Sequence, residues 1–292
     1  MAAAADGQAV GHLPALTGAR VRRALAAHAT LLAGAVLAAL PLLWLVSLSL
    51  QEPEAVFRYP PRFIPERVLW TSYPAAWRAQ PFARMYINSV VTTTLIILGQ
   101  IVTSSLAAYA LTQLRFRGRN LAFLVIISTM MVPIQATFIP AYIIVSRLHW
   151  VDTYWALVMP FVASGFGIFL MRQAFLVVPQ TLVEAARIDG AGHRVILTRI
   201  LLPLARPALA TMAALSFVFH YNDFFWPLIV TNSARVRTLP IGLATMILTE
   251  GAHGTQWNQV MAADVFVIAP ILVAFVFFQR YLSPTALTSG VK

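Results

Sequence analysis

The chain has 292 residues, of which 59% are hydrophobic and only 11% are charged, whereas about 25% are charged in an ordinary soluble domain. So few charges cannot cover a soluble protein of this length, and we expect hydrocarbon to be its main solvent. The 21 basic residues outnumber the 10 acidic ones, which we attribute to arginines that flank membrane spans and not to nucleic-acid binding.

Two absences exclude further classes of site. The chain has no cysteine, which rules out disulfides and thiolate metal sites. Its single lysine is Lys292 at the C-terminus, so the lysine of a phosphate-binding P-loop is missing. If the protein uses ATP, another chain has to bind it.

In chain order, a basic N-terminal arm (1–23) precedes six stretches that are almost free of charge. A bilayer core needs about 20 helical residues, so these stretches predict an all-α polytopic membrane protein with six transmembrane helices. The stretches are 24–50, 85–114, 120–146, 153–171, about 207–234 and about 265–279. We expect the first helix and an external loop in 24–84, a five-helix core in 85–280, and a cytoplasmic tail in 281–292.

The arginines decide the orientation of the six helices. With both termini in the cytoplasm, the inner segments hold 13 of the 21 basic residues, and the short basic connection 115–119 lies inside. Because short basic loops stay in the cytoplasm, we expect both termini and the segment 172–206 on that side.

The cytoplasmic segment 172–206 predicts a helix, a glycine turn and a second helix. Thr181 and Glu184 have the spacing of a capping box, and Gly190 can end the first helix in the left-handed conformation. Val195, Leu197, Ile200 and Leu201 would form one apolar face, after which Pro203 and Pro207 bend the chain. The segment is either an interfacial amphipathic connector or a stiff docking projection with Ala185, Ala186 and Ala191 at its contact face.

At these residues the sequence resembles the permease subunits of ABC importers. The resemblance rests on the spacing of Glu184, Ala185, Ala186, Gly190, Ile200, Leu202 and Pro203. The stretches YPPRFIP (59–65), PFARMYINS (81–89), YNDFFWPLIV (221–230) and the ending 279–292 are similar to the carbohydrate-uptake branch. The resemblance covers about residues 45–292. Leu197 and Tyr221 stand where this branch usually has Phe and Trp.

The resemblance implies a type I ABC-importer permease fold and a non-catalytic subunit in a prokaryotic inner membrane. It implies a heterodimer with a second permease subunit, two ATP-binding subunits that hold ATP and Mg²⁺, and an external solute-binding protein. The solute would be a sugar or a sugar-like compound, such as an oligosaccharide or a glycerol phosphate. The residues implied in coupling to the ATPase are Glu184, Ala185, Ala186, Asp189, Gly190, Ala191, Gly192, Leu197 and Pro203.

A second group of candidates lies around Asp223, the charge inside the fifth stretch. An ionised group at that depth costs about 2.5–3.5 kcal/mol and normally faces a bundle interior or water. His220 and Asp223 are spaced to share a helix face, as a hydrogen-bonded brace or beside the solute, and two such residues make a poor metal or catalytic site. The candidate pathway residues are His220, Tyr221, Asn222, Asp223 and Trp226, whose aromatic members could stack on a sugar or pack against lipid. Asp264 is expected at the water boundary.

Two other classes remain as alternatives. An ATP-independent secondary transporter or channel would need several titratable groups at mid-membrane, where only His220 and Asp223 are available. An intramembrane serine hydrolase would show a nucleophile motif such as G-x-S-x-G, which the sequence lacks.

Overall fold

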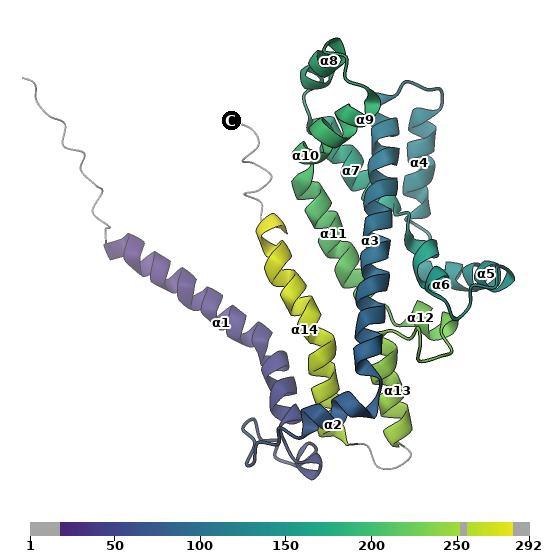
Figure 1. Cartoon of the computed structure of the whole chain (residues 1–292). Coiled ribbons are helices and arrows are strands. Elements are labelled where there is room, and N and C mark those ends of the chain that lie inside the picture. The colour runs from purple at the N-terminus through teal and green to yellow at the C-terminus, as the bar shows by residue number, and fades with distance from the viewer. Residues whose placement is uncertain (1–17, 252–255, 283–292) are drawn as a thin grey trace, which may run out of the picture.

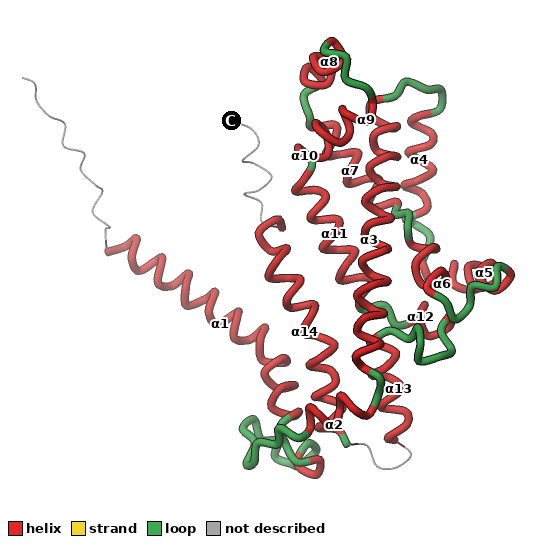
Figure 2. The backbone as a smooth tube through the Cα atoms, in the orientation of Figure 1, coloured by secondary structure: helices red, strands yellow, loops and turns green. Residues whose placement is uncertain are grey.

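The computed structural model describes residues 18–251 and 256–282, and every regular element in these two ranges is helical (Figure 2). The first half comprises α1 (Gly18–Ser49), η1 (Pro53–Ala55), α2 (Ser72–Ala79), α3 (Phe82–Gln113), α4 (Arg119–Thr129), α5 (Ile134–Arg147), α6 (Tyr154–Val158), η2 (Met159–Phe161) and α7 (Gly165–Val177). The second half comprises α8 (Gln180–Ile188), α9 (His193–Val195), the π-helix η3 (Ile196–Leu201), α10 (Leu202–Leu204), α11 (Arg206–Tyr221), α12 (Phe225–Val230), α13 (Leu239–Gly251) and α14 (Trp257–Leu282).

Up to six candidate spans are present, but only three of them are continuous helices. Within α1, α3 and α14, the described stretches 22–49, 82–113 and 257–279 are long and apolar enough to cross a bilayer. The other three spans are pairs of helices bent at a short break, by 98° between α4 and α5, 43° between η2 and α7, and 76° between α10 and α11. The stretches predicted at 120–146 and 153–171 are therefore not single rods. The sixth span begins at Trp257, earlier than the predicted 265, and ends at Gln279 as predicted.

Helix α3 is the central element of the bundle (Figure 1). It packs against α7, α11, α6 and α13, and it buries a row of polar residues that includes Asn88, Gln100 and Ser104. Helix α1 differs because it leaves the bundle along most of its length and contacts α14. Its leucines are widely exposed, with Leu37 at 69%, as expected for a surface that faces lipid or a partner protein.

The buried polar residues of α3 hold the breaks in the neighbouring spans. A broken helix frees backbone carbonyls, and in a bilayer these must find donors within the protein. Gln100 Nε2 donates to the Phe161 carbonyl at 2.9 Å, and Thr103 Oγ1 donates to the Val162 carbonyl at 2.7 Å. Near the other end of α3, Asn88 Nδ2 donates to the carbonyls of Arg235 and Arg237. Helix α3 therefore acts as a rigid support for its irregular neighbours.

Candidate functional site

The predicted coupling segment projects from one end of the bundle (Figure 1). Helix α8 ends at Ile188, and Gly190 has φ of +83°, the left-handed conformation that glycine adopts at little cost. The chain returns through α9, η3 and α10 and then bends by 76° into α11, at a break that lies between Pro203 and Pro207. The predicted helix, glycine turn, second helix and bend are all present.

The predicted capping box does not form. Helix α8 begins two residues earlier than a cap at Thr181 requires, with Pro179 at the N-cap, and no side chain of the described residues caps it. Thr181 lies inside the first turn, so its hydroxyl cannot cap the start of the helix. Glu184 is exposed, and among the described residues the ion pairs involve only Glu66 with Arg58 and Arg62. The Glu184 carboxylate is consequently free on the surface.

The segment is rooted in the bundle by one buried cluster. Val183, Ile196 and Leu201 are at most 1% exposed and pack with Met171 and Phe175 of α7. Leu197 belongs to the same cluster, and the half-buried Ala186 and Ala191 pack against it. Of the three alanines predicted at a docking face, only Ala185 therefore points fully outward.

Two polar contacts fix the segment to the end of α3. Arg187 Nη2 donates to the Gln113 carbonyl at 3.4 Å, and the Tyr109 hydroxyl is hydrogen-bonded to His193 Nδ1 at 2.6 Å. The Tyr109 and His193 rings also meet edge to face at 5.8 Å. Displacement of α8 would therefore be transmitted to α3 as well as to α11.

Of the predicted apolar face of the second helix, Leu197 and Leu201 are buried and Ile200 is half-buried. Val195 is 37% exposed, and Ile196, which was not predicted, is buried instead. The reason is the π-helix over Ile196–Leu201, whose i→i+5 hydrogen bonds align residues five apart and shift the face by one residue.

The outer surface of α8 carries an apolar residue that the sequence analysis missed. Ile188 is 86% exposed and Leu182 is 48% exposed, on the outside of a helix whose Val183 is buried. They flank the exposed Glu184 and Ala185, and Asp189 and Gly192 continue this surface. The sequence shows that apolar residues occur on more than one side of α8. It does not show which side packs against the bundle and which side stays exposed.

The five predicted pathway residues gather at the break between α11 and α12 without forming one cluster. Tyr221 and Trp226 are each 1% exposed, and Trp226 Nε1 donates to the Ala156 carbonyl at 2.8 Å. Asn222 is exposed and donates to the Val218 carbonyl at 2.8 Å. Neither aromatic ring has a face free for a solute.

The predicted pairing of His220 with Asp223 is wrong. Helix α11 ends at Tyr221, so these two residues do not share a helix face. Asp223 Oδ1 accepts the Trp226 N–H at 3.4 Å at the start of α12. His220 Nε2 instead lies 3.1 Å from Gln100 Nε2 of α3.

His220 lines a cavity of about 590 Å³ on the surface of the subunit. Within the described residues, no group of three metal-ligating side chains occurs here or elsewhere. The cavity is lined by Gln100, Ile134, Phe161, Ala163, Ser164, Phe166, Leu215, Ser216, Val218, Phe219 and His220.

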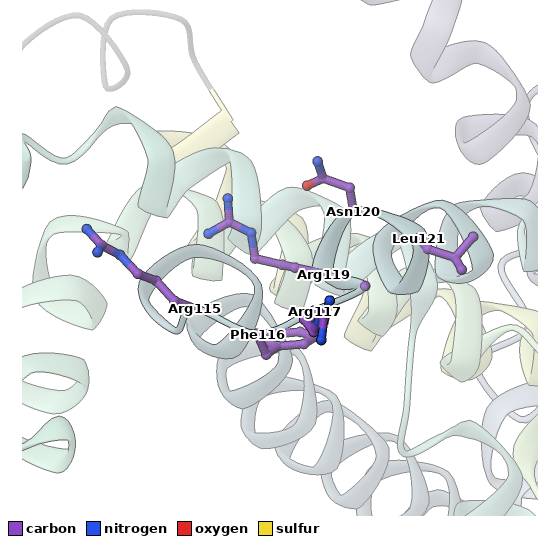
Figure 3. A pocket seen from close by; sticks show the side chains of 7 residues that line it. Arg115, Phe116, Arg117, Arg119, Asn120 and Leu121 are labelled. Carbon is purple, nitrogen blue, oxygen red and sulfur yellow. The ribbon is translucent and has the colours of Figure 1, made fainter.

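A second, open pocket of about 650 Å³ surrounds the turn from α3 to α4, at the same end of the bundle as α8 (Figure 3). Gly118 has φ of +85° at this turn. Arg115, Arg117 and Arg119 all lie at this turn, and none of their guanidinium groups forms an ion pair with a described residue. This end of the molecule is strongly basic, in keeping with the predicted cytoplasmic side.

Helix α13 was not predicted. All but its last two residues belong to the uncharged run 238–249, which is too short to cross a bilayer. A rigid turn precedes it, because Asp152 Oδ1 accepts the N–H groups of Asn232 and Ser233, each at 2.9 Å. The Ser89 hydroxyl also accepts the Leu239 N–H at 2.9 Å.

Comparison with known proteins places this architecture in a family. The family described as "Binding-protein-dependent transport system inner membrane component" matches residues 100–287. The chain is 38% identical over 261 residues to the sn-glycerol-3-phosphate transport system permease protein UgpE of Yersinia pestis bv. Antiqua, covering 87% of this chain and 92% of that protein. It is also 38% identical over 205 residues to the arabinooligosaccharides transport system permease protein AraQ of Halalkalibacterium halodurans, covering 70% and 72%.

A solved structure agrees with the sequence relatives. The crystal structure of a bacterial ABC transporter involved in the import of the acidic polysaccharide alginate matches with a TM-score of 0.79 and 26% identity, covering 92% of this chain and all of that one. The six-span bundle, the projecting α8 and these similarities lead to one assignment. The chain belongs to the family of inner membrane components of binding-protein-dependent transport systems, the permease subunits of ABC importers.

Proposed function

We propose that this permease subunit carries a sugar or a sugar-like solute across the inner membrane and takes the energy from a separate ATPase through the segment 172–206. The observation that carries the proposal is the rooted projection of α8, whose inner face is buried and whose outer face is free. The solutes named for the relatives, sn-glycerol 3-phosphate and arabinooligosaccharides, support this class of solute.

Coupling would work through the rigid path from α8 to the spans. An ATPase subunit would receive the exposed Ile188 and Ala185 in a groove and pair a cation with Glu184. Closure of two ATPase subunits on ATP would then push α8, and the buried cluster behind it would move α7 and α11 together. A stiff connector suits this role because a flexible loop would absorb the displacement.

The proposal includes the other subunits. Two ATP-binding subunits would hold ATP and Mg²⁺, a second permease would form a heterodimer with this chain, and an external protein would deliver the solute. The absence of a P-loop lysine from the sequence supports a non-catalytic role for this chain. The basic turn at Arg115–Arg119 and α8 lie at one end of the bundle, which supports a cytoplasmic position for that end and for both termini.

The experiment is ATP-dependent uptake by membrane vesicles that carry the complete transporter, against a panel of glycerol phosphates, disaccharides and arabinooligosaccharides. We expect Glu184→Lys and Gly190→Pro to insert normally and to abolish uptake of the transported solute. The control is Glu54→Lys, which makes the same charge change on an exposed residue at the opposite end of the bundle, and it should transport normally.

Two results would contradict the proposal. Normal uptake by both α8 variants would show that α8 does not dock an ATPase. Uptake that continues without ATP, with no ATPase copurifying, would favour the alternative of a secondary transporter or channel.

A further inference from the structure

The cavity beside His220 lies where broken spans converge. Ile134 is the first residue of α5 after the break that follows α4, and Ala163 and Ser164 form the break between η2 and α7. His220 is the second-last residue of α11, just before the chain breaks again towards α12. The cavity therefore collects irregular backbone from three separate parts of the chain.

The position of this cavity in the bundle is compatible with a water-filled space. Gln100 is close to the middle of α3, about 4 Å along the helix axis from the centre of Phe82–Gln113. Non-helical backbone at such a depth is tolerated where protein buries it or where it lines a water-filled cavity. The half-exposed Ser164 and the exposed Ala163 are not buried by this chain, so either the second permease subunit of the proposed heterodimer covers them or the cavity holds water.

The hydrogen bonds fix the protonation of the His220 ring. The Phe161 carbonyl can only accept, so the Gln100 atom 2.9 Å from it must be the amide nitrogen. The Ser216 hydroxyl then donates to Gln100 Oε1 at 2.5 Å. The second N–H of Gln100 donates to His220 Nε2 at 3.1 Å, and the proton of a neutral imidazole must therefore be on Nδ1.

That N–H is available to a solute. Among the described residues no group accepts from His220 Nδ1, and the ring is held between Phe161 and Phe219, with centroid distances of 5.2 and 5.1 Å. The lining includes no Asp, Glu, Lys or Arg. A phosphate or carboxylate would therefore find no cation there, whereas a hydroxyl oxygen would find a donor and aromatic surfaces beside it.

We propose that the cavity between His220, Gln100 and Ser164 is a water-filled subsite for the uncharged, hydroxyl-bearing part of the transported solute, with the His220 Nδ1–H as its donor. This inference rests on the proposed function, because a solute has to pass the subunit. The subsite would give the hydroxyl groups of the solute one polar contact in the pathway. A phosphate group of the solute would have to bind elsewhere.

The first test uses the natural lack of cysteine in the chain. Single variants Ala163→Cys, in the cavity, and Leu37→Cys, on the exposed side of α1, are treated with a hydrophilic methanethiosulfonate in vesicles that carry the complete transporter. We expect labelling at Ala163→Cys alone, slowed at least fivefold by the panel solute that the unmodified transporter takes up, and not slowed by inorganic phosphate. Absence of labelling at Ala163→Cys, or labelling that the solute does not slow, would overturn the proposal.

The second test separates the donor from the packing of the ring. His220→Phe should lower the maximal uptake rate about tenfold, the effect of losing one hydrogen bond of about 1.4 kcal/mol. His220→Gln, which can accept from Gln100 and still donate to the solute, should restore most of that rate. Normal uptake by His220→Phe, or an equal loss in both variants, would refute the donor role. These results differ from a failure of the proposed function itself. If the chain is not an ATP-coupled permease, uptake by the unmodified protein will not depend on ATP.

Discussion

The amide of Gln100 is the clearest place to test how α3 holds the broken spans. Gln100 is 4% exposed and forms hydrogen bonds with the Phe161 carbonyl, His220 Nε2 and the Ser216 hydroxyl. Gln100→Leu removes all three bonds and leaves a similar volume. Hydrogen bonds between membrane helices average about 0.6 kcal/mol, so three contribute about 2 kcal/mol. The unpaired Phe161 carbonyl adds about 1 kcal/mol.

We therefore expect Gln100→Leu to lower the free energy of unfolding by about 2–3 kcal/mol, measured by reversible denaturation in detergent micelles. The matched control is Gln279→Leu in α14, where, among the described residues, the exposed side chain bonds only to the nearby Val276 carbonyl at 3.2 Å. The control should change the free energy by less than about 0.5 kcal/mol. If the two variants lose the same stability, α3 does not hold the break through this amide.

Two further predictions concern the outer turn and the buried tyrosine. Burial acts to raise the pKa of Asp152, but hydrogen bonds from Ser233 and Asn232 outweigh it and hold the pKa below its ordinary value. The stabilisation by the carboxylate is thus complete above pH 5 and lost as the pH falls through the lowered pKa. Asp152→Ala should cost about 1–2 kcal/mol in unfolding free energy between pH 5 and 8, and the difference from the unmodified protein should shrink below about pH 4; a difference that shrinks already between pH 7 and 5 would contradict this. The Tyr221 hydroxyl is buried and has no hydrogen-bond partner in the described part of the chain, so Tyr221→Phe should leave the unfolding temperature unchanged or raise it. A fall of several degrees would show that the hydroxyl is bonded.

The sequence predicted the number and composition of the spans because hydropathy reports on the solvent around a segment. It did not predict that the third and fourth spans are broken. The break in the third span, residues 130–133, contains Pro133. The break in the fourth span is at Val162–Ser164, with no proline between η2 and α7. Its stability comes from Gln100 and Thr103 on another helix, which a reading of local sequence does not connect.

In the coupling segment, too, some features were predictable from the local sequence and others were not. Gly190 was predicted to turn the chain because few residues other than glycine enter that conformation cheaply, and the structure confirms it. The capping box failed because Pro179 already starts α8, and the pairing of His220 with Asp223 failed because α11 ends between them. Local chemistry was predictable where one residue decides it, whereas helix boundaries depended on contacts with distant parts of the chain.

The π-helix at Ile196–Leu201 determines how the coupling segment responds to a change in its helical twist. In an α-helix, residues five apart would be turned by about 140° from each other, so Ile196 and Leu201 could not both be inserted into the same hydrophobic cluster. With both side chains at most 1% exposed, rewinding the segment to an α-helix would expose one of them to solvent. The burial of both side chains therefore opposes a change of twist in this segment, because such a change would remove apolar surface from the cluster.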